Sequence, residues 1–177
     1  CRGLAVTLSV IRALIAEKVS FAGTVTFVAD VGEEGLGDLR GMKELFDNTL
    51  KGQADAFITL DGGGLGLNNT GVGSYRYRVT FSGPGGHSFG AFGMANPIHA
   101  LGRAIAKIDE IQVSENPKTT FNVGRVGGGT SVNSIPFEVA MEVDMRSVSP
   151  VELRKIDAEL KRIVAAAVDE ENTTRAT

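Results

Sequence analysis

The sequence predicts an α/β protein made of two different kinds of sheet. In the first third of the chain, unbroken apolar runs at residues 24–28 and 56–60 alternate with helical patterns. That order is typical of parallel strands buried on both faces. From about residue 71 onward, the strand-like segments instead alternate apolar and polar side chains, which indicates a sheet with one face in water.

Apolar side chains at helical spacing predict the helices of the first part. They recur over residues 4–15 and again over residues 39–50, and the second pattern ends at Gly52. The resulting order is helix, strand, helix, strand. Ligand sites of parallel α/β sheets lie at the carboxyl ends of the strands, so the residues that follow 24–28 and 56–60 are candidates.

The second part has a β-α-β-β-α pattern. Alternating strands are predicted at 75–81, 119–126 and 137–146. One helix begins at Asn96-Pro97, where a capping side chain precedes proline, and a long one begins at Ser149-Pro150. This order lacks only a final strand to be a ferredoxin-like α/β sandwich. We therefore predict two domains, residues 1–72 and residues 73–177, the latter lacking its last strand.

Composition excludes several functional classes. The chain of 177 residues is 42% hydrophobic and 22% charged, which is ordinary for a soluble globular protein. A net charge of -3 with scattered Lys and Arg argues against nucleic acid or a membrane as partner. No apolar run is long enough to cross a bilayer, no signal peptide is visible, and one cysteine cannot form an internal disulfide. We expect a cytoplasmic protein.

The start of the sequence suggests a piece of a longer protein. The chain begins at Cys1 without methionine, directly inside a hydrophobic helical pattern that has no capping residue before it. We therefore expect residues upstream of this sequence.

Three carboxylates follow the two predicted parallel strands. Glu33 and Glu34 stand side by side in a glycine-bounded loop, and Asp61 follows the second strand. Adjacent carboxylates repel each other, so a metal ion or a proton-transfer task would explain them; a solvated turn is the alternative. A catalytic zinc needs about three protein ligands, usually including histidine, and no suitable histidine is close in sequence. The metal site is therefore expected to be incomplete.

Three further polar residues lie in the second part. His87 stands in a glycine-rich loop that presents its imidazole rather than packing it, whereas His99 lies in a helix and is expected to be structural. Asn133 could bind a ligand or simply form a turn. Arg146 could bind a ligand or be a solvated strand residue paired with Asp144.

Taken together, five motifs resemble the di-zinc metallopeptidases and deacylases that include aminoacylase, acetylornithine deacetylase, succinyl-diaminopimelate desuccinylase and peptidase T. Each motif is weak alone, but their order and spacing are specific to this family. They are Val31-Gly32-Glu33-Glu34-Gly35, Leu60-Asp61-Gly62, Gly85-Gly86-His87-Ser88, Gly127-Gly128-Gly129 with Asn133 and Pro136, and Asp144-Met145-Arg146.

The resemblance implies a zinc-exopeptidase-type sheet domain followed by a lid that mediates homodimerisation. It implies that Glu33 is the general base, and that Glu34 and Asp61 bind one zinc each. His87 would reach into the partner subunit's active site and steady the oxyanion, while Asn133 and Arg146 would hold the substrate. The remaining ligands, a histidine and an aspartate upstream and a histidine downstream, would lie outside this sequence.

The implied function is hydrolysis of an amide bond in a small peptide or an N-acyl amino acid. The full protein would be a metallopeptidase or amidohydrolase with two Zn²⁺ ions, for which Co²⁺ or Mn²⁺ could substitute, and this fragment would be inactive alone. The alternative is a non-catalytic dimerisation or ligand-binding regulatory module, a frequent use of ferredoxin-like sandwiches.

Overall fold

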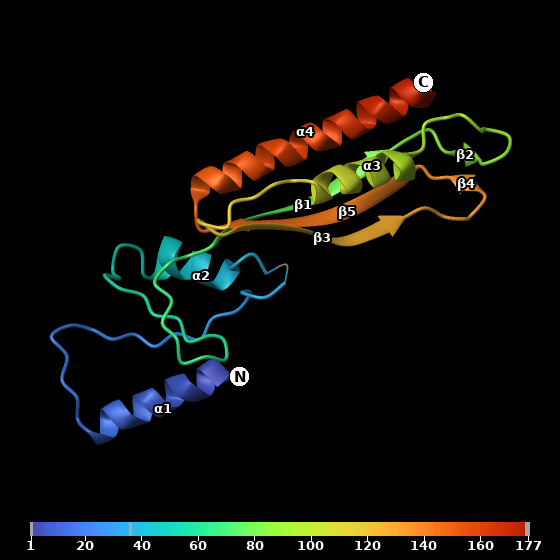
Figure 1. The fold of residues 1–177 in the computed structure, drawn as a ribbon. Helices are drawn as coiled ribbons and strands as arrows, with labels where there is room; N and C mark the ends of the chain where they lie inside the picture. Colours follow the sequence, from blue (N-terminus) through green and yellow to red (C-terminus); the bar gives the residue numbers. More distant parts are fainter. Residues whose placement is uncertain (1, 36, 176–177) are drawn as a thin grey trace. The chain divides into compact units, whose positions relative to one another are not determined.

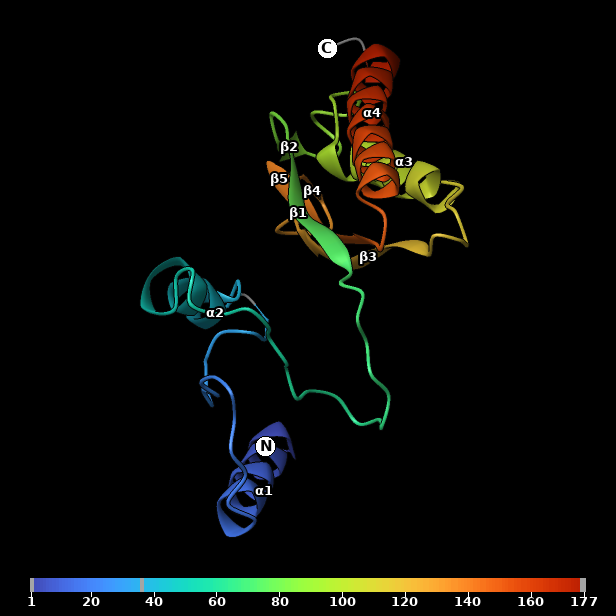
Figure 2. The same ribbon diagram turned by 90° about the vertical axis from the view of Figure 1, so that its left-hand side faces the viewer.

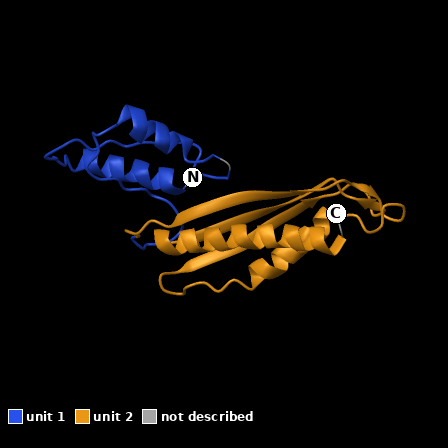
Figure 3. Cartoon of the chain, turned by 90° about the horizontal axis from the view of Figure 1, so that it is seen from above, with its two compact units in different colours: residues 1–67 blue, residues 68–177 orange. Residues whose placement is uncertain are grey.

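A computed structural model describes residues 2–35 and 37–175 of the chain. Cys1, on which the expectation of a truncated start rests, lies outside the described residues. The chain divides into two units, residues 1–67 and residues 68–177 (Figure 3).

The second unit contains a three-stranded antiparallel sheet. Its strands are β1 (Gly73–Ser82), β3 (Thr119–Gly128) and β5 (Glu138–Ser147), and their spatial order is β1-β5-β3 (Figure 1). Strand β5 is central and pairs along its whole length with β1. This is the predicted β-α-β-β-α pattern, and the mixed α/β class with an open sheet is confirmed.

Two helices, α3 (Pro97–Asp109) and α4 (Pro150–Arg175), cover one face of this sheet (Figures 1 and 2). Alternate residues of β5 point into the resulting core, because successive side chains of a strand face opposite ways. The most buried hydrophobic side chains of the sheet and helices are Ala104, Ile108, Met141, Met145 and Leu160.

Helix α3 begins where the sequence predicts. The side chain of Asn96 accepts a hydrogen bond from the backbone N–H of Ile98 at 3.0 Å, and Pro97 occupies the first turn. The cap satisfies one of the backbone donors that a helix start leaves unpaired, and proline loses nothing there because it has no N–H.

A second, two-stranded ladder joins two loops that the sequence left without strands. It pairs β2 (Gly86–His87) with β4 (Ser134–Ile135). We call residues 83–95 and 129–137, which surround this ladder, the flap. It extends beyond the end of the sheet at which β5 begins (Figure 1).

The first unit contains the two predicted helices. Helix α1 spans Arg2–Ala16, and α2 spans Arg40–Glu44 before a single π-helical turn, η1, continues it over Leu45–Thr49. Among the described residues, none of the helices is long and apolar enough to cross a membrane.

The strands predicted at 24–28 and 56–60 are not formed in the structure, which is a correction to the sequence interpretation. A strand persists only when a neighbour satisfies its backbone groups, and the described residues of this unit supply no ladder. Side chains that the pattern assigned to a buried sheet are therefore exposed, including Phe27 at 42% and Ile58 at 79%. Apolar composition predicts burial, but it does not supply the partner strands.

Candidate functional site

The flap brings His87 and Asn133 together from positions 46 residues apart in the sequence. His87 pairs with Ser134 across the β2–β4 ladder. Immediately beyond this pair, the backbone N–H of Ser88 donates to the carbonyl oxygen of Asn133 at 2.9 Å. Both site residues are exposed, so their side chains are available to a ligand.

Local hydrogen bonds fix which atoms these two side chains present. Nδ1 of His87 accepts from the backbone N–H of Phe89 at 3.3 Å. A neutral imidazole that accepts at Nδ1 carries its proton on Nε2, which is therefore a donor. Likewise, Oδ1 of Asn133 accepts from the hydroxyl of Ser131 at 2.6 Å, which leaves the amide N–H groups as donors. The flap thus presents two N–H donors, the combination that stabilises a developing oxyanion.

The backbone of the flap depends on a close approach that glycine permits. Gly85 has a φ of +68°, and a Cβ at this position would overlap the ring of Phe137. The ring therefore packs directly over the backbone two residues before His87. The motif pointed to the histidine, but not to this contact.

The flap also carries three exposed aromatic side chains that the sequence interpretation missed. Phe89 is 90% exposed, Phe92 84% and Phe137 67%. The available signal was the run Ser88-Phe89-Gly90-Ala91-Phe92, in which two aromatic residues alternate with small ones inside a loop. Exposed aromatic residues beside polar donors are typical of a surface that is covered in use.

Arg146 lies at the other end of the sheet. It pairs with Ser74 across β1 and with Thr120 across β3. Glu138, at the flap end of β5, is eight residues away, which corresponds to about 26 Å along a strand. The structure therefore does not bring Arg146 together with His87 and Asn133 within one chain.

The ion pair that the sequence offered as an alternative role for Arg146 is present. Its Nε donates to Oδ2 of Asp144 at 2.7 Å. The Nε of Arg76, on the neighbouring strand, donates to Oδ1 of the same carboxylate at 2.8 Å. Burial alone would raise the pKa of Asp144, but the hydrogen bonds and charges of Arg146 and Arg76 outweigh it and lower the pKa.

The three carboxylates of the first unit are exposed and do not form a metal centre there. Asp61 accepts from the backbone N–H of Gly62 at 2.6 Å, and the carbonyl oxygen of Glu34 accepts from the N–H of Gly37 at 3.1 Å. These are turn contacts. Within residues 2–35 and 37–175, no three His, Cys, Asp or Glu side chains gather closely enough to hold a metal ion.

Comparison with known families decides what this fold is. The model of the M20 peptidase dimerisation domain matches residues 70–172, more than half of the chain. The chain belongs to the M20 family. This result confirms the resemblance inferred from the motifs. The M20 match includes His87, Asn133 and Arg146, whereas Glu33, Glu34 and Asp61 lie before it.

One curated M20 relative is a succinyl-diaminopimelate desuccinylase from Nitrosospira multiformis. It is 26% identical to this chain and aligns with 91% of it, but with only 46% of its own length. The chain thus spans about half the length of this relative.

Solved structures share the fold of the M20 lid. An aminobenzoyl-glutamate utilization protein from Klebsiella pneumoniae superposes with a TM-score of 0.54 at 22% identity, over 62% of this chain and 30% of the other. An amidase of the hydantoinase/carbamoylase family from Burkholderia multivorans gives 0.51 at 24% identity, over 57% of this chain and 25% of the other.

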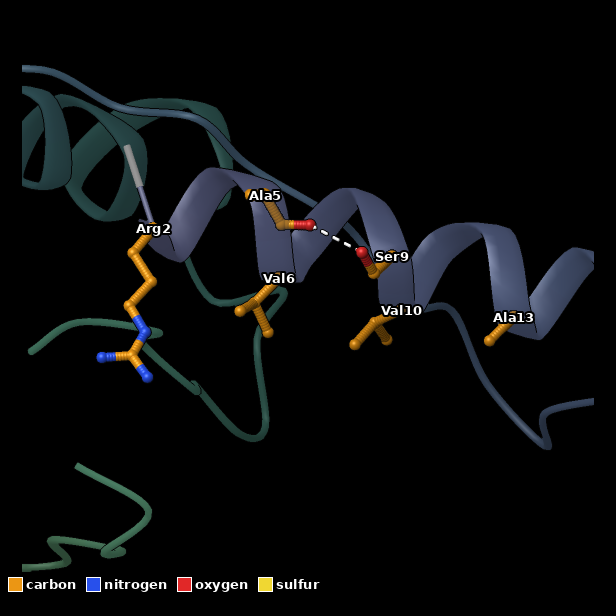
Figure 4. A pocket seen from close by; sticks show the side chains of 6 residues that line it. All are labelled: Arg2, Ala5, Val6, Ser9, Val10 and Ala13. Atoms are coloured by element: carbon orange, nitrogen blue, oxygen red, sulfur yellow. Dashed lines mark hydrogen bonds between the residues drawn. The ribbon is translucent and has the colours of Figure 1, made fainter. Parts of the chain in front are cut away.

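Helix α1 carries a shallow apolar hollow that none of the candidate site residues lines. It is lined along one face of the helix by Arg2, Ala5, Val6, Ser9, Val10 and Ala13 (Figure 4). The hydroxyl of Ser9 donates to the carbonyl oxygen of Ala5 at 2.9 Å, so this hydroxyl already has a hydrogen-bond partner.

Proposed function

We propose that the whole protein to which this chain contributes is a zinc-dependent hydrolase of amide bonds in small peptides or N-acyl amino acids. The observation that carries this proposal is that the two paired loops of the flap each present an N–H donor, His87 Nε2 from one and the Asn133 amide from the other. Membership of the M20 family supports it, and the desuccinylase relative is by its name a deacylase.

The proposed role of the two flap residues is to bind the carbonyl oxygen of the scissile amide. Negative charge develops on that oxygen when a nucleophile attacks the carbonyl carbon, and donors already in place stabilise it. The bonds from Phe89 to His87 and from Ser131 to Asn133 hold the donors before the substrate arrives. Loss of one such donor typically lowers kcat about a hundredfold or more.

For the first unit, we assign Glu33 as the general base that takes a proton from the attacking water and passes it to the leaving amine. Glu34 and Asp61 are the proposed carboxylate ligands of the zinc ions. The described residues do not gather three candidate ligands, so the proposed metal centre needs further ligands from outside them.

The separation of Arg146 from the flap supports a homodimer in which each lid serves two active sites. At about 26 Å along β5, one protomer's Arg146 cannot bind the same small substrate as its own His87. We propose that Arg146 binds a substrate carboxylate in one site, while His87 and Asn133 act in the site of the partner subunit.

The proposal is tested by combining metal analysis with turnover of the whole protein. Glu33→Gln should retain zinc and lose most of its turnover, whereas Glu34→Ala and Asp61→Ala should lose zinc. Near wild-type turnover by Glu33→Gln with zinc bound would contradict the assigned base. A wild-type protein free of metal and of hydrolytic activity would favour a non-catalytic dimerisation or binding module.

A further inference from the structure

The face of the second unit's sheet that α3 and α4 leave uncovered carries two arginine pairs, each on a single carboxylate. Arg76 and Arg146 both bond to Asp144. Two residues further along β1 and β5, Glu142 also binds two arginines. Arg78 on β1 donates to one of its oxygens and Arg125 on β3 to the other, each at 3.2 Å.

This arrangement leaves an excess of positive charge that the sheet does not need. One arginine per carboxylate would satisfy a cross-strand ion pair, whereas two arginines on one carboxylate leave a net charge of +1. Together the two groups contain four arginines and two carboxylates, a net charge of +2. Glu138 shares the face but is six residues from Asp144 along β5, about 20 Å away.

In the group around Asp144, both arginines keep their terminal guanidinium nitrogens available for a ligand. Arg76 and Arg146 each bond to the carboxylate through Nε. The hydrogen bonds of the described residues leave their terminal nitrogens without a partner, and the side chains are 58% and 49% exposed. Two planar groups are thus anchored at their bases with their outer N–H groups free, and each group can bind one carboxylate through two parallel hydrogen bonds.

We infer that Arg76 and Arg146, held by Asp144, form a binding site for a ligand that carries two carboxylate groups. Each guanidinium takes one carboxylate, and the second arginine pair supplies the remaining positive charge that a dianion requires. That this ligand is the substrate rests on the proposed function. It then restricts that substrate to a peptide or N-acyl amino acid with a second acidic group.

The test is a titration of the chain with glutarate, with acetate as the single-carboxylate reference at the same ionic strength. NMR spectra that resolve the arginine Nε–H groups report which side chains respond. We expect glutarate to shift the Arg76 and Arg146 signals and to bind about tenfold or more tightly than acetate, because two charge-assisted contacts replace one. Equal affinity for the two probes would overturn the inference.

Variants separate a built site from a merely positive surface. Arg76→Lys keeps the charge but loses the planar group, and we expect it to weaken glutarate binding several-fold. Arg162→Gln is the matched control, since Arg162 is an exposed helix arginine with its own ion pair to Glu159. Equal losses in Arg76→Lys and Arg162→Gln would contradict the site.

The variant Asp144→Asn tests whether the anion responds to the built site or only to net charge. Removal of the anchoring carboxylate should weaken glutarate binding, although the surface becomes more positive. Tighter binding by this variant would show that the anion responds to net charge alone. Because the titration needs neither metal nor turnover, its failure leaves the hydrolysis proposal standing, and an inactive whole protein would not affect its result.

Discussion

The backbone N–H of Ser88 donates to the carbonyl oxygen of Asn133 at 2.9 Å, and this contact extends the short β2–β4 ladder by one residue. Two loops that are separated by a helix and a strand are thereby held in one register. Since His87 adjoins Ser88, this ladder holds the backbone segments that carry the two donors next to each other. The geometry of the candidate site is therefore a property of the flap backbone, which can be perturbed without changing either donor.

Gly85→Ala is expected to disturb this backbone. Its φ of +68° strains any residue with a Cβ, by about 1–2 kcal/mol, and the added methyl overlaps the ring of Phe137. We expect a lower free energy of unfolding in urea and shifted NMR signals of His87. Gly90→Ala, in the same loop but with open space around it, is the control and should leave the His87 signals in place. Unchanged signals in Gly85→Ala would refute the contact.

Glu171→Gln should be strongly destabilising. Glu171 is 2% exposed, accepts from the backbone N–H of Asn96 at 2.9 Å, and pairs with Arg103. Its neutralisation removes the charge-assisted bond to Arg103, which keeps its exposed partner Glu170, and such a bond typically contributes about 1.5–3 kcal/mol. Urea unfolding measures the loss. Glu159→Gln, which breaks an exposed pair on the same helix, should change stability by less than about 1 kcal/mol. Similar losses in both variants would contradict this interpretation.

The same carboxylate predicts how stability depends on pH. Burial alone would raise the pKa of Glu171, but the hydrogen bond from Asn96 and the charges of Arg103 and His99 outweigh it and lower the pKa. The unfolded chain therefore binds more protons than the native state as the pH falls below the ordinary glutamate value of 4.5. The stabilisation is complete above that value and is lost as the pH falls through the lowered pKa. Urea unfolding between about pH 6 and pH 3 should show a smaller loss for Glu171→Gln than for wild type.

The sequence predicted the second unit well because its strands and helix starts are marked by patterns of neighbouring residues. Alternation gave the three long strands, and Asn96-Pro97 gave the start of α3. The strands predicted at 24–28 and 56–60 failed because strand formation depends on a neighbour that no local pattern supplies. The same limit applies to the site. Motifs pointed to His87 and Asn133, but the pairing of their two loops and the carboxylate shared by Arg76 and Arg146 depend on contacts between residues distant in the sequence.

Mixing of two inactive variants of the whole protein tests whether the active site is shared between subunits. Glu33→Gln lacks the proposed base, and His87→Ala lacks the proposed oxyanion donor. If His87 acts in the partner's site, a mixed dimer contains one site with an intact base from the His87→Ala subunit and an intact donor from the Glu33→Gln subunit. Random exchange gives about half mixed dimers, each with one restored site, so we expect about a quarter of wild-type turnover. If subunit exchange is verified and no activity returns, then His87 acts within its own chain.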